Sequence, residues 1–425
     1  MGKNVRSSNF AQDQVSAQWE ELRKKEGLAF KGILANSVLL DVIGKHIAEY
    51  RERIFCPATT LFAFLQQVLS TDRSCRGAVA QVNVDRVASG LSPASSDTGA
   101  YCRARDRLPE SLLYDLLVHC GNEMEESVPQ KWLWKNRHVK GVDGTTVLVN
   151  DTQENRDEFQ SQSNKAGLMQ LPMARCVAVF SLITGSILDL RIGPYRGEGT
   201  GELSLLRKML NCFSRKDIVV CDAYYPAYYL AWCLQQMGAD IVVREKAGQP
   251  IPYTLLQRLG KDDELIYWNK PHHPAAWMGK VFHDFLPNFV VARRCKITIE
   301  QPGFRTKHFT VITTLVDSAY ASRDDMAKLY RQRWQVEVNL RSIKSALQME
   351  YIPCKKPEMV RKEILATLIA YNLIRKLIGL VAEVHELNPL QISFKGAVQN
   401  LNRFKNLFQY SQIDTEAITH ALFFS

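Results

Sequence analysis

The sequence predicts an α/β protein with a central mixed sheet, a strand-rich insertion and helices at both ends. Three observations predict this class. Helical periodicity dominates the first 135 residues, strands and helices alternate over 136–246, and strands return over 247–317 before helices resume. We therefore expect an N-terminal helical domain over 1–135 and a core formed by 136–246 and 318–385. An all-β insertion domain over 247–317 would interrupt the core, and a C-terminal helical tail would follow it over 386–425.

The expected core begins with a meander of strands. Residues 136–150 place strand-like runs on either side of Asp143 and Gly144, which predicts two strands joined by a turn at that dipeptide. Residues 174–195 predict two more strands around Thr184–Gly185. A helix, a buried strand ending at Asp222, another helix and another buried strand follow over 201–213, 217–225, 227–238 and 239–246. This order is typical of a ribonuclease-H-like core.

The remaining elements flank this core. The insertion reads as strands joined by Pro-rich loops, with residues 280–285 as one of the strands. One helix is expected over 329–348, and a longer amphipathic helix over 358–384 should pack on the sheet. Near the N-terminus, a short helix carries Arg103 and Arg105. This helix is either a DNA-facing element or one member of a small helical bundle that happens to be basic.

The charge balance favours a polyanionic partner. The 425 residues carry a formal net charge of +10 at pH 7, and neutralising phosphates releases counterions from nucleic acid. Ribosomal, tRNA-binding and membrane-surface proteins would show the same excess. No apolar run approaches the ~20 residues of a membrane span, the N-terminus lacks a signal-peptide core, and the ten cysteines include no CxxC pair. We expect a cytoplasmic protein without zinc.

The segment from Leu329 to Gln348 concentrates polar functional groups. At helical spacing, one face carries a single carboxylate among basic and phenolic groups, namely Tyr330, Arg333, Glu337, Arg341 and Lys344. A solvated helix face held by i,i+4 ion pairs, such as Arg333–Glu337, would give the same pattern. The functional interpretation gains weight from two aspartates elsewhere in the chain.

Asp143 and Asp222 are both expected at strand ends, where open α/β sheets form ligand crevices. A carboxylate beside a buried strand is costly unless a cation pairs with it. With Glu337 the two aspartates would make a hard oxygen site suited to Mg²⁺. Two ions about 3.5–4 Å apart would activate a nucleophile and stabilise the leaving oxygen of a phosphodiester. The alternatives are a turn residue at Asp143 and a helix cap at Asp222.

These residues resemble a DDE-type bacterial insertion-sequence transposase of the IS-four family. The family signature is Tyr, two residues, Arg, three residues, Glu, six residues and Lys, and Tyr330, Arg333, Glu337 and Lys344 match every spacing. Its two other blocks are similar to 142–155 and 217–246, and the resemblance covers nearly the whole chain. It implies that Asp143, Asp222 and Glu337 bind two Mg²⁺ ions, which Mn²⁺ would replace. It also implies that Arg333 and Lys344 contact phosphates of the transposon end, with Tyr330 beside them. Arg341 lies on the same helix face and is a weaker candidate contact that the family pattern does not demand.

The resemblance implies an enzyme that acts on double-stranded DNA. The N-terminal helices would bind the terminal inverted repeats, the core would hydrolyse the transferred strand, and the freed 3′-hydroxyls would attack target DNA. The family implies cut-and-paste excision through a hairpin intermediate, by a homodimer bridging two ends at the nucleoid of a bacterial cell. The tail is the expected dimer surface.

The insertion would help to hold a flipped base on an aromatic ring, with Trp268 and Trp277 as candidates and core packing as the alternative for both. Two rival functions remain open. One is a catalytically inactive or domesticated derivative that only binds DNA, and the other is an unrelated ribonuclease-H-like nuclease.

Overall fold

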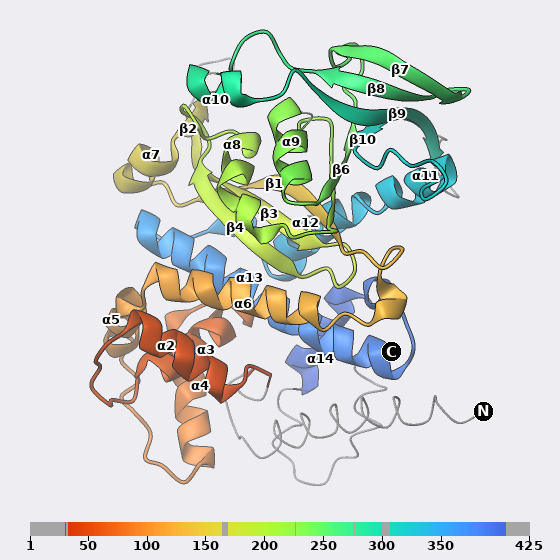
Figure 1. The fold of residues 1–425 in the computed structure, drawn as a ribbon. Helices are drawn as coiled ribbons and strands as arrows, with labels where there is room; N and C mark the ends of the chain where they lie inside the picture. Colours follow the sequence, from red (N-terminus) through yellow and green to blue (C-terminus); the bar gives the residue numbers. More distant parts are fainter. Residues whose placement is uncertain are drawn as a thin grey trace, which may run out of the picture.

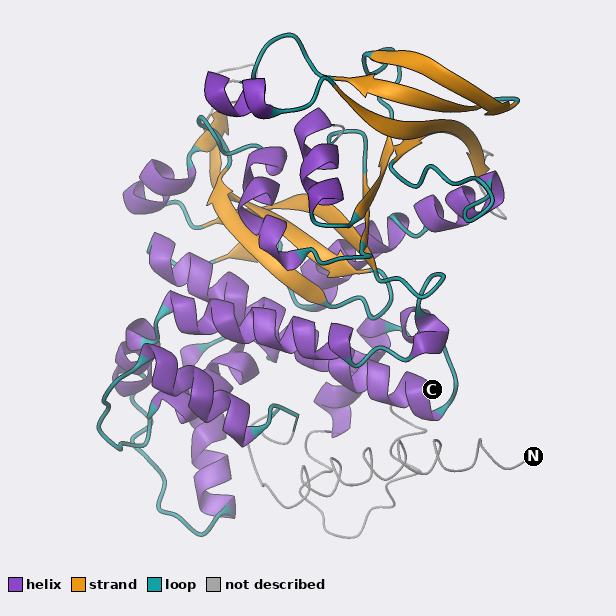
Figure 2. Cartoon of the chain, in the orientation of Figure 1, coloured by secondary structure: helices purple, strands orange, loops and turns teal. Residues whose placement is uncertain are grey.

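The computed structural model describes residues 30, 33–163, 169–225, 227–275, 277–299 and 307–404. The N-terminal helices lie below the sheet in the view of Figure 1, and other helices lie beside the strands in the upper part of the molecule. Figure 2 shows the same arrangement by secondary structure. The first 29 residues of the predicted N-terminal domain and residues 405–425 of the predicted tail lie outside the described residues.

The described part of the N-terminal region contains helices and connecting loops. Pro57 occupies the first turn of its helix, where its missing N–H costs nothing. Ser74 caps the next helix by accepting a hydrogen bond from the Gly77 N–H at 2.9 Å. The helices are α2 (Asn36–His46), α3 (Pro57–Leu69), α4 (Cys75–Ala88), α5 (Gly99–Arg107) and α6 (Glu110–Glu126), followed by the short η1 (Gln130–Trp132).

Strand β1 (Val139–Val149) lies at the centre of the sheet. On one edge it pairs antiparallel with β3 (Met169–Ser181), which also pairs with β2 (Ser161–Ser163) and β4 (Ile187–Pro194). On the other edge it pairs parallel with β5 (Ile218–Cys221), which pairs parallel with β6 (Asp240–Arg244). The order β4-β3-β1-β5-β6 is that of a ribonuclease-H-like sheet, so the predicted core is confirmed.

The turn predicted at Asp143 and Gly144 is wrong. Both residues lie inside β1, where Asp143 is paired with Ala178 and Gly144 with Val177. An Asp-Gly dipeptide favours a hairpin when the strands on its two sides can pair with each other. Here β3 pairs with β1 from Lys140 to Leu148 without a break, so the chain stays extended through the dipeptide.

The predicted insertion extends the same sheet. Strand β10 (Lys307–Thr313) pairs antiparallel with β6, and β9 (Phe289–Ile299), β8 (Asp263–Asn269) and β7 (Tyr253–Gly260) follow in order. The strand predicted over 280–285 is wrong, because this segment is the helix α10 (Lys280–Phe285). Helical spacing brings Phe282 and Phe285 to the same indole, with ring centroids 6.2 and 5.9 Å from that of Trp232. The insertion therefore contains a helix besides its strands.

Two hydrophobic clusters cover the two faces of the sheet. Helices α8 (Glu202–Leu206), η2 (Arg207–Cys212) and α9 (Tyr228–Gln236) pack on the face that contains Val142 and Val219. The opposite face, with Val139 and Val220, is covered by α12 (Trp334–Ala346), α13 (Pro357–Val384) and the N-terminal helices. In the described part of the chain, α13 alone is long and apolar enough to cross a membrane, but 83% of its most apolar window is buried inside the protein. Core packing accounts for its composition.

Several smaller elements complete the structure. Strand β11 (Tyr351–Ile352) pairs parallel with the far end of β1, and Phe394 at the start of α14 (Phe394–Phe404) packs on Tyr371 of α13 at a centroid distance of 4.8 Å. The others are α7 (Gln153–Phe159), α11 (Arg323–Arg331) and η3 (Pro389–Gln391).

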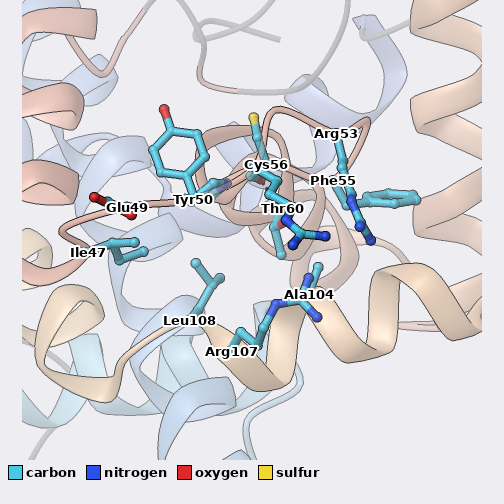
Figure 3. A pocket seen from close by; sticks show the side chains of 12 residues that line it. Ile47, Glu49, Tyr50, Arg53, Phe55, Cys56, Thr60, Ala104, Arg107 and Leu108 are labelled. Atoms are coloured by element: carbon cyan, nitrogen blue, oxygen red, sulfur yellow. Dashed lines mark hydrogen bonds between the residues drawn. The ribbon is translucent and has the colours of Figure 1, made fainter.

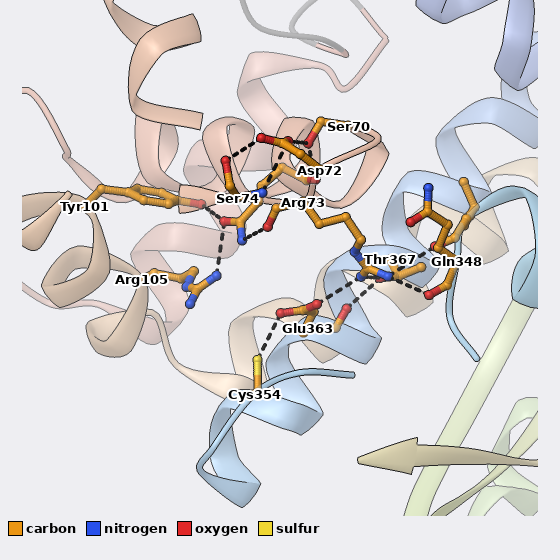
Figure 4. Close-up of polar contacts among 12 residues, drawn as sticks. Ser70, Asp72, Arg73, Ser74, Tyr101, Arg105, Gln348, Cys354, Glu363 and Thr367 are labelled. Atoms are coloured by element: carbon orange, nitrogen blue, oxygen red, sulfur yellow. Dashed lines mark hydrogen bonds and ion pairs between the residues drawn. The ribbon is translucent and has the colours of Figure 1, made fainter. Parts of the chain in front are cut away.

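Arg73 joins the N-terminal helices to the rest of the molecule. It lies in the turn between α3 and α4 and donates hydrogen bonds to the backbone carbonyls of Leu347 and Gln348, directly after α12. It also pairs with Glu363 of α13 at 3.0 Å, where both side chains are at least nine-tenths buried. Figure 4 shows this network from α3 to α13. Removing one partner of such a buried pair strongly destabilises a protein, because the other charge is left buried and uncompensated.

Candidate active site

Asp143 and Asp222 meet where the pairing between β1 and β5 ends. The last parallel pair is Gly141 with Val220, so the same register places Asp143 opposite Asp222 just beyond it. Among the described strands, none pairs with this edge of β1 between Gly141 and Leu148, where β11 begins. The crevice predicted at the ends of the strands is thus formed at an interruption along one edge of β1.

Helix α12 lies directly against β1 at this point. A Cβ atom added to Gly141 would lie 2.5 Å from Cγ2 of Val336, so only glycine allows this approach. Side chains two residues apart on a strand point to the same face. Asp143 therefore faces the same side as Gly141, toward the helix that carries Glu337, the neighbour of Val336. The structure brings Asp143, Asp222 and the first turn of α12 to one face of the sheet.

Asp143 lies in an electrostatically unfavourable position. Burial raises the pKa of its carboxyl to about 7, and the like charges of Asp222 and Glu202 act in the same direction. The hydrogen bond from the Gly144 N–H, at 2.8 Å, and the charge of Arg333 oppose this rise only in part. Within the described residues, no ion pair is formed by Asp143. A cation bound beside it would relieve the burial cost.

Glu337 is bound to a cation of its own helix. Arg333 Nη2 lies 2.7 Å from Glu337 Oε1, with the glutamate side chain 45% exposed. This is the i,i+4 ion pair that the sequence offered as an alternative to function. The continuous helix predicted over 329–348 is wrong, because a turn at Gln332 and Arg333 separates α11 from α12. Backbone bonds of the tighter i→i+3 type run through it, for instance from the Val336 N–H to the Arg333 carbonyl at 3.0 Å.

The other residues of the predicted helix face occupy different environments. Tyr330 ends up on α11, where burial raises the pKa of its phenol to about 12. Its buried hydroxyl has no hydrogen-bond partner among the described residues, and it lies close enough to Arg333 and Asp222 to sense their charges. Arg341 is exposed, and Lys344 is partly buried. The residues predicted to share one helix face thus range in burial from the buried Tyr330 to the exposed Arg341.

The donor set suits a hard divalent cation. Carboxylate oxygens are the ligands that Mg²⁺ prefers, and Asp143 with Asp222 supplies two such groups in one crevice. In the part of the chain that is described, no three His, Cys, Asp or Glu side chains lie close enough together to hold one metal ion. The pair between Arg333 and Glu337 keeps the third carboxylate engaged. Asp143 and Asp222 are therefore the residues that could hold a metal here. Glu337 could join them only by leaving its ion pair with Arg333.

The two tryptophans are placed very differently. Trp268 of β8 is 1% exposed and packs edge-on against Tyr228 at 6.3 Å between centroids, so core packing describes it and base stacking does not fit its position. Trp277 is 37% exposed, with the guanidinium of Arg207 3.5 Å from its ring centroid and Tyr229 at 4.7 Å. Of the two, only Trp277 has a ring that a base could reach.

The two predicted arginines of α5 also diverge. Arg105 turns into the helical region (Figure 4), where it donates to the Gln67 side chain at 3.0 Å. Its guanidinium also stacks on the Phe64 ring, 5.0 Å from the centroid. Helix α5 buries the face that carries Tyr101 and Ala104, and the Arg105 side chain lies on that inward side. This position does not fit the expected DNA contact. Arg103 is exposed. Alternating arginines in a sequence cannot show which of them points outward.

An arginine-lined cavity of about 480 Å³ lies between α5 and the segment that joins α2 to α3. Figure 3 shows Arg53 and Arg107 reaching it from these two segments, beside Thr60 and Leu108. Arg51 lines it as well, and none of the three arginines forms an ion pair with a residue that the structure describes. Unpaired guanidinium groups in a groove are the usual means of holding phosphates. We call Arg51, Arg53 and Arg107 the arginine cleft.

Sequence reasoning missed a fourth carboxylate close to the site. Glu202, the first residue of α8, lies against Gly144: a Cβ atom added to this glycine would be 2.5 Å from Cδ of Glu202. Glu202 Oε2 accepts a hydrogen bond from the hydroxyl of Tyr225 at 2.9 Å. The available signal was weak, since Glu202 stands at the N-terminus of a predicted helix, where acidic residues are common.

Comparison with known proteins shows the family of this chain. A family model described as a transposase DDE domain matches residues 137–373, which is more than half of the chain and contains both strand-borne aspartates and Glu337. The chain belongs to the transposase DDE domain family. The DDE-type family expected from the sequence is thereby confirmed, whereas the match does not test the roles of individual residues. DDE transposase domains generally use divalent metal ions.

The relatives of this DDE transposase domain are insertion-sequence transposases. Transposase InsG for insertion sequence element IS4, from Escherichia coli (strain K12), is 25% identical over 69% of this chain and 64% of its own length. The chain thus spans just under two thirds of that relative. The transposase for insertion sequence element IS421 of Escherichia coli is 35% identical over 19% of this chain and 20% of its own. A piggyBac transposase in a synaptic complex with hairpin DNA aligns with 90% of this chain and 80% of its own, at 11% identity and a TM-score of 0.42.

Proposed function

We propose that this chain is a Mg²⁺-dependent DNA transposase. It would hydrolyse phosphodiester bonds at the inverted-repeat ends of its element and transfer the 3′-hydroxyls into target DNA. The observation that carries the proposal is the approach of Asp143 and Asp222 beneath the helix of Glu337, within a domain of the DDE family. Cut-and-paste excision through a hairpin, by a homodimer in the bacterial cytoplasm, is part of the same proposal.

The three carboxylates would share the work of holding the metal. Asp143 and Asp222 would bind the metal from the crevice that they share, and Glu337 would exchange its bond with Arg333 for the metal when DNA is bound. Once free, the Arg333 guanidinium would be available to a phosphate of the scissile strand. Divalent ions in such a site activate the attacking oxygen and stabilise the leaving one. Mn²⁺, which also prefers oxygen ligands, would replace Mg²⁺.

The chain's basic groups would position the DNA. Arg333 and Lys344, with Arg341 at the margin, would contact phosphates near the scissile bond, Tyr330 would lie beside them, and Trp277 would stack a flipped base. The arginine cleft, which lies between α5 and the segment that joins α2 to α3, would hold the backbone of the transposon end together with Arg103. The separation of these groups matches an enzyme that binds an end with one region and cuts it with another.

Cleavage of a labelled duplex that carries the element's end tests the proposal. The wild type is compared with Glu337→Gln and with Glu350→Gln, an exposed glutamate just after α12 that serves as the matched control. We expect nicking at the element boundary with Mg²⁺ and none with EDTA, a loss of at least about 10³-fold in Glu337→Gln, and unchanged binding in a gel shift for both variants.

Other outcomes point to the rival functions. Binding of the end without cleavage by the wild type would identify a DNA-binding derivative in which Glu337 stays with Arg333. Cleavage that ignores the end sequence would identify another nuclease of this fold. Cleavage that survives Glu337→Gln would remove this residue from the site.

A further inference from the structure

The backbone ladder does not hold the two aspartates in place. Asp143 and Asp222 both lie beyond Gly141 and Val220, the last residues through which β1 pairs with β5, so no ladder hydrogen bond between these two strands fixes their separation. Asp222 also begins a tight turn, in which its carboxylate accepts from the Tyr224 N–H at 2.7 Å and its carbonyl from the Tyr225 N–H at 3.3 Å. The register of such a turn against β1 needs another restraint.

A phenol and a carboxylate on the opposite face of the sheet supply that restraint. Tyr225 closes the turn of Asp222 and is fully buried, and its hydroxyl donates to Glu202 Oε2 at 2.9 Å. Glu202 in turn lies on Gly144, the residue after Asp143, where an added Cβ would be 2.5 Å from both Cδ and Oε1. The chain of contacts thus runs from the Asp222 turn through Tyr225 and Glu202 to the backbone next to Asp143.

We propose that Tyr225 and Glu202 form a clamp that sets the distance between the two catalytic aspartates. Glu202 acts as a positioning residue and not as a metal ligand, because Gly144 and Asp143 face opposite sides of β1. Glycine at 144 is required for the clamp, since any side chain there would displace the Glu202 carboxyl. The inference rests on the proposed function, in which Asp143 and Asp222 hold the metal.

Four variants separate a clamp from the alternatives. Tyr225→Phe removes the donated hydrogen bond, Glu202→Ala removes the acceptor, and Gly144→Ala pushes the carboxyl away without changing any charge. Glu202→Gln keeps an acceptor oxygen but loses the charge. The matched control is Tyr228→Phe, which deletes another phenol of the same layer, bonded to the Pro287 carbonyl at 2.6 Å.

Two measurements are made on each full-length variant: Mn²⁺ affinity of the DNA-free protein by electron paramagnetic resonance, and the rate of end cleavage at saturating DNA. For Tyr225→Phe, Glu202→Ala and Gly144→Ala we expect Mn²⁺ affinity to fall at least about threefold and the cleavage rate about 10- to 100-fold, as misplacement of about 1 Å does. End binding should stay unchanged. Glu202→Gln and Tyr228→Phe should remain within about threefold of the wild type.

The proposal is overturned if Tyr225→Phe keeps wild-type Mn²⁺ affinity and rate. It is also overturned if Glu202→Gln loses Mn²⁺ as severely as Glu202→Ala, because Glu202 would then act through its charge as a ligand. Should Glu202→Ala fail to fold by circular dichroism, Tyr225→Phe, which lacks a single oxygen, decides the matter. A wild type that does not cleave with any metal would refute the proposed function instead, while the Mn²⁺ measurement would still test the clamp.

Discussion

Replacing Asp143 by Asn should make the metal-free protein more stable. The carboxyl is partly buried and forms no ion pair within the described residues, and burial raises its pKa from 3.8 to about 7. A shift of about three units corresponds to about 4 kcal/mol, because each unit is worth 1.36 kcal/mol. Partial exposure and solvent screening reduce this figure, so we expect a gain of about 2 kcal/mol. Asn keeps the shape and the acceptor for the Gly144 N–H.

The sign of the pH dependence follows from proton linkage. Between pH 3.8 and about 7 the folded protein holds more protons at Asp143 than the unfolded chain does, so wild-type stability falls as the pH rises through this window. The advantage of Asp143→Asn should therefore be small near pH 4, grow up to about pH 7, and stay constant above it. A divalent ion should cancel the advantage by stabilising only the wild type, by about 2.7 kcal/mol at a concentration 100 times its dissociation constant.

Chemical denaturation in EDTA and in Mg²⁺, at pH 5 and pH 8, measures both effects. Asp217→Asn is the control, since its buried carboxylate pairs with Lys140 at 2.6 Å and its loss should destabilise the protein. The reasoning about Asp143 fails if Asp143→Asn is no more stable than the wild type at pH 8 in EDTA. It also fails if Mg²⁺ stabilises both proteins equally.

Three further predictions concern the rest of the molecule. Arg73→Met should lower the unfolding free energy by about 3–5 kcal/mol, because it leaves Glu363 buried and unpaired; denaturation of Arg73→Met with and without Glu363→Gln should show partial recovery in the double variant. The hydrogen bond that the imidazole Nδ1 of His138 donates to Glu125 at 2.9 Å raises the pKa of His138 despite burial, with Asp217 adding to the rise and Lys140 opposing it. The stabilisation from this pair is full below about pH 6.5 and is lost as the pH rises through the raised pKa, so Glu125→Gln should cost more stability at pH 6 than at pH 8, and an equal cost would contradict it. Arg107→Ala should weaken end binding and reduce the slope of log K against log salt by about 0.9, as loss of one phosphate contact does, whereas Lys261→Ala in the turn after β7 should leave the slope unchanged.

The sequence predicted the architecture well because its segments of periodic hydrophobicity are long. Most strands and helices over 136–246, the helix α13 and most strands of the insertion have patterns that tertiary structure did not override. Short local patterns that are compatible with two structures gave the wrong prediction. Asp143-Gly144 is a good turn pair, but an uninterrupted partner in β3 kept it extended. The segment KVFHDF over 280–285 alternates like a strand. Phe282 and Phe285 are three residues apart, however, and a helix lets both rings pack on Trp232, whereas a strand would point them to opposite sides.

The candidate site was predictable as a list of residues but not as a geometry. Spacing along one expected helix made Glu337 a candidate, and strand context made Asp143 and Asp222 candidates. Spacing could not show that Arg105 packs on Phe64 while Arg103 is exposed, because both fall on the same short helix. Spacing could not point to Glu202, since its relation to the site is its close approach to Gly144, which only the fold creates.

The place of the site follows from how β1 is paired. A strand paired on both edges satisfies its backbone and leaves no opening, and β1 is paired in this way up to Gly141 and again from Leu148. The interruption between them is the only stretch of β1 in the described structure where one edge is open to a substrate while the other is held by β3. An open edge gives access to Asp143 but removes the hydrogen bonds that would fix its distance from Asp222. Contacts from helices on both faces, Val336 on Gly141 and Glu202 on Gly144, therefore have to position the carboxylates that the sheet leaves unrestrained.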